Sequence, residues 1–165
     1  MIPTPPHRVP ASPQQFVREA QRSTNERDTT AARRVFARDA LWVSIIDGMV
    51  IEAHGITEID QRWQLLCRFM HARRMTVTKR LMTSDDRLIV NEWSGSLDGR
   101  DTAVGIEYWI FDDKGSVTEQ RLYGFLDAHP DTSLRQSLRM LSSYPRTALA
   151  FARARVSTAA AAPVR

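Results

Sequence analysis

Residues 40–53 read ALWVSIIDGMVIEA, and this stretch, together with its flanks, decides the fold. Both of its halves are rich in β-branched and aromatic residues, which favour β-strands. Asp47-Gly48 lies between the halves, and this dipeptide is a strong signal for a two-residue hairpin turn. The stretch therefore predicts two antiparallel strands.

A helix is predicted directly after this hairpin, from Ile56 to about His71. Its apolar residues alternate three and four positions apart, as one buried helical stripe requires. These residues are Ile59, Trp63, Leu66 and Met70.

Two further helices are predicted before the hairpin. Ser12, Pro13 and Gln15 supply a capping hydroxyl, a first-turn proline and a capping-box partner, so the first helix should run from about Pro13 to Ser23. Asp28 is predicted to cap a second, short helix. The inward-facing residues of that helix would be Ala32, Val35 and Phe36.

Four more strands are predicted after the third helix, separated by turn-forming residues. They are MTVTKRLMT from Met75, RLIVNEWSGSL from Arg87, TAVGIEYWIFD from Thr102 and SVTEQRLYGFLD from Ser116. Parallel βαβ units would place a helix between successive strands, so this order predicts an α+β fold. Three helices would pack on one face of a curved, mostly antiparallel sheet and enclose a cone.

The chain of 165 residues is long enough for one domain, predicted at 13–128. A flexible, proline-rich leader is expected at 1–12, and a basic extension at 129–165. Within the extension, helices are expected around Leu134–Leu141 and Thr147–Val156, and the final STAAAAPVR is expected to be disordered.

Composition excludes several classes of function. With 42% hydrophobic and 25% charged residues, and with no apolar run of about 18 residues, the chain is expected to be soluble and cytoplasmic, without a membrane partner. Residues 129–165 hold six Arg and one Asp, net +5, so a total of +4 leaves −1 for the rest. A near-neutral domain is not expected to bind nucleic acid.

No metal site and no cofactor are predicted. Cys67 is the single cysteine, and His54 and His71 do not have the spacing of metal ligands.

The order of elements, together with NERDTTAARRVFARDALWV at 25–43 and DDKGSVTEQRLYGFLD at 112–127, resembles the SnoaL-like and ketosteroid-isomerase-like families. The resemblance spans about Pro13 to Asp127. It implies the nuclear transport factor 2-like fold and a small apolar substrate. Known members include isomerases, polyketide cyclases, dehydratases and proteins without a known reaction.

Most acidic or donor positions of the family are replaced in this chain. The tyrosine that donates to the oxyanion in the isomerases falls on Ala20, and their proton-carrying aspartate falls on Ser44. The aspartate that epoxide hydrolases and cyclases place on the last strand falls on Leu122. The second oxyanion acid falls on Glu107, which is the one carboxyl group retained. Steroid isomerisation by the family mechanism is therefore not expected.

Strand alternation predicts which residues line the inside of the cone, because residues two apart share a face. Apolar and aromatic side chains with a few polar groups are typical of small-molecule pockets, although the same residues could simply fill the core. The predicted lining is Phe16, Ala20, Trp42, Ser44, Trp63, Asn91, Trp93, Trp109, Gln120 and Leu122.

Glu107 is the predicted catalytic residue. Between Ile106 and Tyr108 its carboxyl group should lose hydration, which favours the protonated form and would allow it to act as an acid or to donate to an oxyanion. Two alternatives remain open. Glu107 could form a salt bridge to an arginine across the mouth of the cone, or the strand could be shifted by one residue so that Glu107 faces solvent.

Two functions follow. The first is a SnoaL-like enzyme performing cofactor-free acid–base chemistry, an isomerase, dehydratase or cyclase, on an apolar substrate. The second is a non-catalytic module that binds a ligand or oligomerises. Glu119, Arg121 and Tyr123 should lie on the outer sheet face, which is expected to form the homodimer interface that the resemblance implies.

Overall fold

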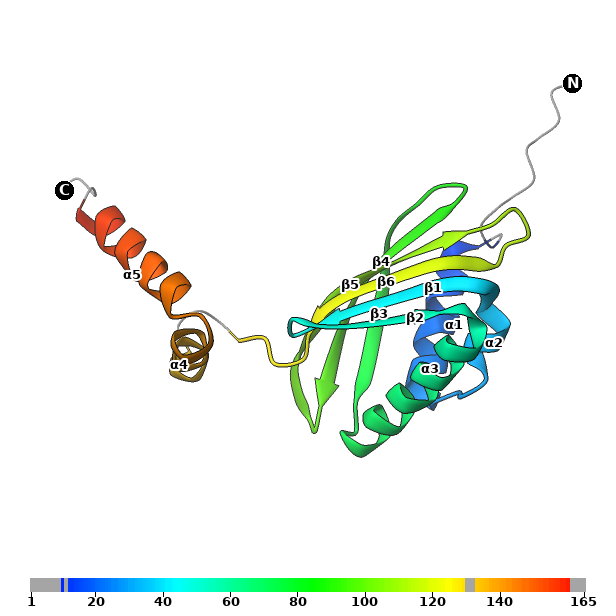
Figure 1. The fold of residues 1–165 in the computed structure, drawn as a ribbon, viewed down its shortest axis with the longest axis horizontal. Coiled ribbons are helices and arrows are strands. Elements are labelled where there is room, and N and C mark those ends of the chain that lie inside the picture. The colour runs from blue at the N-terminus through cyan, green and yellow to red at the C-terminus, as the bar shows by residue number, and fades with distance from the viewer. Residues whose placement is uncertain (1–9, 11, 130–132, 161–165) are drawn as a thin grey trace, which may run out of the picture. The chain divides into compact units, whose positions relative to one another are not determined.

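The computed structural model describes residues 10, 12–129 and 133–160. The chain divides into two units, Met1–Ala128 and His129–Arg165. The described part of the first unit holds the sheet with helices α1 to α3, and that of the second holds α4 and α5 (Figure 1). Most of the leader predicted at 1–12 lies outside the described residues.

The predicted hairpin is confirmed. Strand β1 (Phe36–Ile46) pairs with β2 (Met49–His54) in antiparallel register. Asp47 and Gly48 form the turn with φ angles of 51° and 82°, and such left-handed angles at both central residues define the turn that matches strand twist.

The remaining strands complete one curved six-stranded sheet in the order β2-β1-β6-β5-β4-β3. They are β3 (Thr76–Ser84), β4 (Leu88–Leu97), β5 (Arg100–Phe111) and β6 (Val117–Phe125). Among the described strands only the pairing of β1 with β6 is parallel, so the α+β, mostly antiparallel prediction is confirmed. Strand β5 begins two residues earlier than predicted because Asp98 and Gly99 alone make the turn before it, with φ angles of 50° and 80°.

Helix α1 spans Pro13–Glu26 and is three residues longer than predicted. The Ser12 hydroxyl accepts a hydrogen bond from the Gln15 N–H, as a cap should. Helix α3 spans Gly55–Ala72, close to the prediction.

The prediction for the second helix needs two corrections. Helix α2 spans Ala31–Val35, and Phe36 opens β1 instead of closing the helix. The residue before the helix is Thr30, not Asp28. Asp28 accepts hydrogen bonds from both the N–H and the hydroxyl of Thr30, and also from Arg34. Chiefly through Arg34, these bonds lower the pKa of Asp28 to about 2.

Helices α1 to α3 lie on one face of the sheet (Figure 1). Three clusters of buried side chains fill the space between them, centred on Trp93, Trp109 and Trp42. Trp63 and Leu66 of α3 contact both the Trp93 and the Trp42 cluster. Cys67 is buried in the Trp93 cluster, where its side chain packs against apolar residues. Burial also raises the pKa of its thiol.

The second unit consists of α4 (Leu134–Ser143) and α5 (Pro145–Ala160). Its helices agree with the prediction, but α5 continues to Ala160, so the first four residues of the predicted disordered end are helical. The remaining residues, 161–165, lie outside the described part. Among the described residues, no helix is long and apolar enough to span a membrane.

Candidate functional site

The strand register brings four of the predicted site residues into one row across the inner face of the sheet. Asn91 on β4 pairs with Glu107 on β5, Glu107 with Leu122 on β6, and Leu122 with Ser44 on β1. Asn91 and Glu107 have no exposed surface, and Ser44 is nearly buried. The predicted inward direction of Glu107 is therefore correct.

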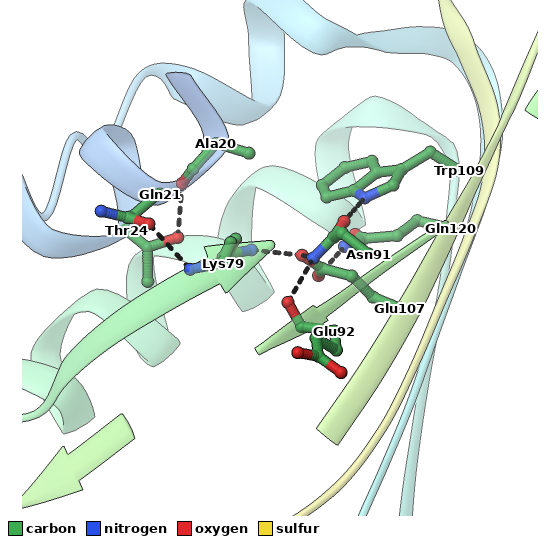
Figure 2. A network of polar contacts seen from close by, with 9 residues as sticks. All are labelled: Ala20, Gln21, Thr24, Lys79, Asn91, Glu92, Glu107, Trp109 and Gln120. Carbon is green, nitrogen blue, oxygen red and sulfur yellow. Dashed lines mark hydrogen bonds and ion pairs between the residues drawn. The ribbon is translucent and has the colours of Figure 1, made fainter. Parts of the chain in front are cut away.

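Glu107 is the centre of a buried polar network (Figure 2). Its Oε1 atom accepts a hydrogen bond from Asn91 Nδ2 at 2.9 Å, and its Oε2 atom accepts one from Gln120 Nε2 at 3.0 Å. The Lys79 ammonium group forms an ion pair with Oε1. Three donors on three other strands thus converge on one carboxylate.

A second layer of contacts holds these donors in place. Asn91 Oδ1 accepts a hydrogen bond from Trp109 Nε1 at 3.0 Å, which fixes the orientation of the amide. The Lys79 backbone N–H donates to Gln21 Oε1 of α1 at 2.7 Å, and the Lys79 ammonium lies 5.7 Å from the centroid of the Trp109 ring (Figure 2). The network is tied both to the sheet and to α1.

Lys79 is the functional residue that the sequence reasoning missed. The sequence leaves open a salt bridge from Glu107 to an arginine. In the structure the partner is a lysine from β3, and only 7% of its side chain is exposed. The sequence does contain a signal for this contact. Val77, Lys79 and Leu81 are two residues apart, so Lys79 shares one strand face with two apolar residues. The chain contains only two lysines, Lys79 and Lys114.

The ion pair changes what Glu107 can do. Both carboxylate oxygens already have partners within the fold, an ammonium group and two amide donors. The group that the sequence predicts as an acid is therefore engaged in structural contacts. With no solvent contact, Glu107 can meet a substrate only if neighbouring side chains move.

A more accessible region adjoins this network. Ile46 and Leu122 on the strands and Trp63 and Leu66 on α3 are partly exposed side chains that pack against the Trp93 cluster. Ser44, which is buried, pairs with Leu122 in the sheet. We call these five residues the α3 group. Trp63 is held in place by a hydrogen bond of 2.6 Å from its Nε1 to the Asp28 carbonyl oxygen.

Trp93 is the buried residue at the centre of the cluster against which four members of the α3 group pack. A Cβ atom on Gly105 would lie 2.5 Å from its ring, and one on Gly124 would lie 2.4 Å from it, so the indole lies directly against both glycines. The indole N–H groups of Trp93 and Trp42 are buried and have no hydrogen-bond partner within the described part of the chain.

The other predicted lining residues are placed elsewhere. Phe16 and Ala20 of α1 pack in the Trp109 cluster, where Phe16 meets the Trp109 ring edge-on with centroids 5.2 Å apart. The predicted lining is thus divided between the α3 group and the buried clusters of the core. A hollow on the solvent side of α3 contains none of the predicted residues and is lined by Glu58, Gln61, Arg62, Leu65 and Arg68. No cluster of potential metal ligands occurs within the described residues.

The outer sheet face carries an apolar patch. Val104 pairs with Phe125 and Ile106 pairs with Tyr123 across β5 and β6, and all four side chains are exposed. We call these four residues the outer patch. It is flanked by ion pairs on the same face, between Arg121 and Glu119 and between Arg80 and Glu92.

Comparison with known proteins supports the fold. No family model and no curated protein matches the sequence. Among solved structures, a steroid delta-isomerase from Pseudomonas aeruginosa is 19% identical with a TM-score of 0.53, covering 86% of this chain and 97% of its own. A SnoaL-like protein from Burkholderia thailandensis is 16% identical with a TM-score of 0.56, covering 70% and 98%.

A third similar structure is that of SalBIII, an epoxide hydrolase/cyclase-like enzyme of pyran ring formation in salinomycin. It is 15% identical with a TM-score of 0.53, covering 69% of this chain and 91% of its own. Identities this low define architecture, not chemistry. The chain therefore has the same fold as these SnoaL-like and nuclear transport factor 2-like proteins.

Proposed function

We propose that this protein binds a small apolar molecule among the partly exposed residues of the α3 group and that Glu107 holds this part of the inner face in shape without reacting. The observation that carries the proposal is the contrast between two neighbours. Glu107 is fully buried and bonded to three donors, whereas its cross-strand partner Leu122 keeps solvent exposure on the inner face. Apolar walls with one hydroxyl group, that of Ser44, suit a ligand with few polar atoms.

Binding can be measured by quenching of tryptophan fluorescence with 2-naphthol, since Trp63 belongs to the α3 group. Leu122→Phe should occupy the proposed site and weaken binding by about tenfold or more, because a ligand of this size loses most of its contact area. Ile106→Phe, on the outer face of the neighbouring strand, is the matched control and should leave the affinity unchanged. Equal affinities for both variants and the wild type would contradict the proposal.

A second candidate is the acid–base enzyme, isomerase, dehydratase or cyclase. It is favoured by the position of Glu107 directly beside the partly exposed Leu122 on the inner face, so that movement of neighbouring side chains would bring the carboxylate to a bound substrate. Enzymes of two of these kinds, a steroid isomerase and a cyclase-like enzyme, share the fold.

Proton transfer can be followed by NMR as deuterium incorporation from D2O at the carbon next to the carbonyl of 2-decalone. A binding module leaves this rate at the value in buffer. If Glu107 is a base, the protein accelerates exchange, and Lys79→Met/Glu107→Gln should lower the acceleration by about 100-fold or more. The double substitution is used because it removes both charges together and leaves neither one buried alone.

We also propose that the protein forms a homodimer through the outer patch. Exposed apolar side chains in cross-strand pairs, bordered by charged groups, have the composition of a subunit interface. Ile106→Glu should convert the dimer to a monomer in light scattering coupled to size-exclusion chromatography. Met82→Glu, which places the same charge on an exposed apolar position of β3, should leave the mass unchanged. A monomeric wild type would contradict the proposal.

A further inference from the structure

Helix α4 presents a narrow apolar stripe to solvent. Leu134, Leu138 and Leu141 are spaced four and three residues apart, so they share one side of the helix. Their exposed fractions are 82%, 66% and 51%, which is unusual for leucines in a folded unit. Arg135 and Arg139 lie about 100° further around the helix, beside the stripe.

Helix α5 also exposes large apolar side chains to solvent. Tyr144, at the junction of the two helices, is 63% exposed, and Leu149 and Phe151 on α5 are 52% and 58% exposed. The two helices contact each other, yet this contact leaves six large apolar side chains of the second unit open to solvent.

The charged side chains of residues 133–160 are all positive. Residues 133–160 contain five arginines and no aspartate or glutamate. Residues 1–128, in contrast, carry a net charge of −1. The apolar stripe therefore sits within a basic field, and a partner should offer both an apolar layer and negative charge.

An anionic lipid surface offers both in one place. A short helix with leucines on one side and arginines beside them can lie in the plane of the headgroups, with its leucines among the acyl chains and its arginines at the level of the phosphates. A second copy of the segment fits less well, because it brings another positive field. Nucleic acid would leave the leucines uncovered.

We propose that α4 and α5 bind an anionic membrane surface through the leucine stripe and the arginines beside it. The expectation of no membrane partner rested on the lack of a run long enough to span a bilayer. Surface binding needs no such run and agrees with the finding that no described helix could span one.

The test is co-sedimentation of the full chain with vesicles of phosphatidylcholine alone and with vesicles containing roughly a quarter phosphatidylglycerol. Binding should be stronger to the anionic vesicles, and it should weaken between about 0.05 M and about 0.5 M salt, because screening shortens the reach of the arginines.

Two substitutions separate the apolar and the electrostatic contributions. Leu138→Ala should lower binding about tenfold without changing the charge, whereas Gln136→Ala, on the polar side of the same helix, should leave binding unchanged. Arg146→Gln, which removes one of the five positive charges of residues 133–160, should lower binding to the anionic vesicles about fivefold and should not affect binding to phosphatidylcholine.

Three outcomes would overturn the proposal. The first is equal sedimentation with both kinds of vesicle, and the second is full binding by Leu138→Ala. The third is a doubled mass without vesicles that Leu138→Ala reduces to the monomer, because the stripe would then be covered by a second copy of the chain.

Discussion

Lys79→Met is expected to destabilise the protein by about 3–5 kcal/mol, since it leaves the Glu107 carboxylate buried without its ammonium partner. Glu107→Gln should cost a similar amount for the converse reason, because it leaves the Lys79 ammonium buried alone. The measurement is urea unfolding, followed by tryptophan fluorescence.

The double variant Lys79→Met/Glu107→Gln should be more stable than either single variant. It contains no uncompensated charge, and the glutamine introduced on β5 can still accept a hydrogen bond from Asn91 or Gln120. A double variant whose loss equals the sum of the single losses would show that the two groups act independently.

A matched control joins β3 to its neighbour β4 on the outer face of the sheet. Arg80 and Glu92 form an ion pair of 2.7 Å on the outer face, where both side chains are exposed. Arg80→Met and Glu92→Gln should leave the urea midpoint close to that of the wild type, because water screens this pair. The contrast tests burial, since both pairs join a β3 cation to an acid on a sheet strand.

Gly105→Ala is the second substitution with a large expected effect. Its new methyl group would lie 2.3 Å from the Tyr123 carbonyl oxygen and 2.5 Å from the Trp93 ring. The carbonyl belongs to a paired strand and cannot move away without breaking the sheet. We expect a loss of about 3 kcal/mol or more in urea unfolding, or failure to fold.

Gly124→Ala separates the two causes of this effect. Its methyl group would lie 2.4 Å from the Trp93 ring but 3.0 Å from the nearest backbone oxygen, that of Val104. In a Trp93→Leu background the cost of Gly124→Ala should therefore fall to about 1 kcal/mol or less, whereas Gly105→Ala should stay costly. Circular dichroism is the suitable signal, because a tryptophan is removed. Equal rescue of both alanines would contradict the backbone clash.

The sequence predicted the order of elements well because that order depends on local signals. Asp47-Gly48 favours a tight turn wherever it occurs between strands, and the three-and-four spacing around Trp63 favours a helix in any context. The errors lie at boundaries. The sequence predicts Asp28 as a helix cap, but its carboxylate accepts a hydrogen bond from the backbone N–H of Thr30 instead. At such positions several hydrogen-bond patterns compete with similar energies.

The inward direction of Asn91, Glu107 and Gln120 was also predictable from sequence, because strand alternation fixes the face of each residue once the strand is known. Their bonding was not. Lys79 is far from Glu107 in sequence, and the two meet only because the strand register places them diagonally across β4, with Lys79 opposite Trp93 and Glu107 opposite Asn91.

The α+β fold and the composition of its inner face thus follow from local sequence patterns. How much of that interior is filled depends on tertiary packing. Trp93 lies against Gly105 and Gly124 because these residues of two other strands carry no side chain, and Glu107 has a cationic partner because Lys79 reaches it. Both contacts join segments distant in sequence, so their energies depend on packing in three dimensions and leave no local pattern.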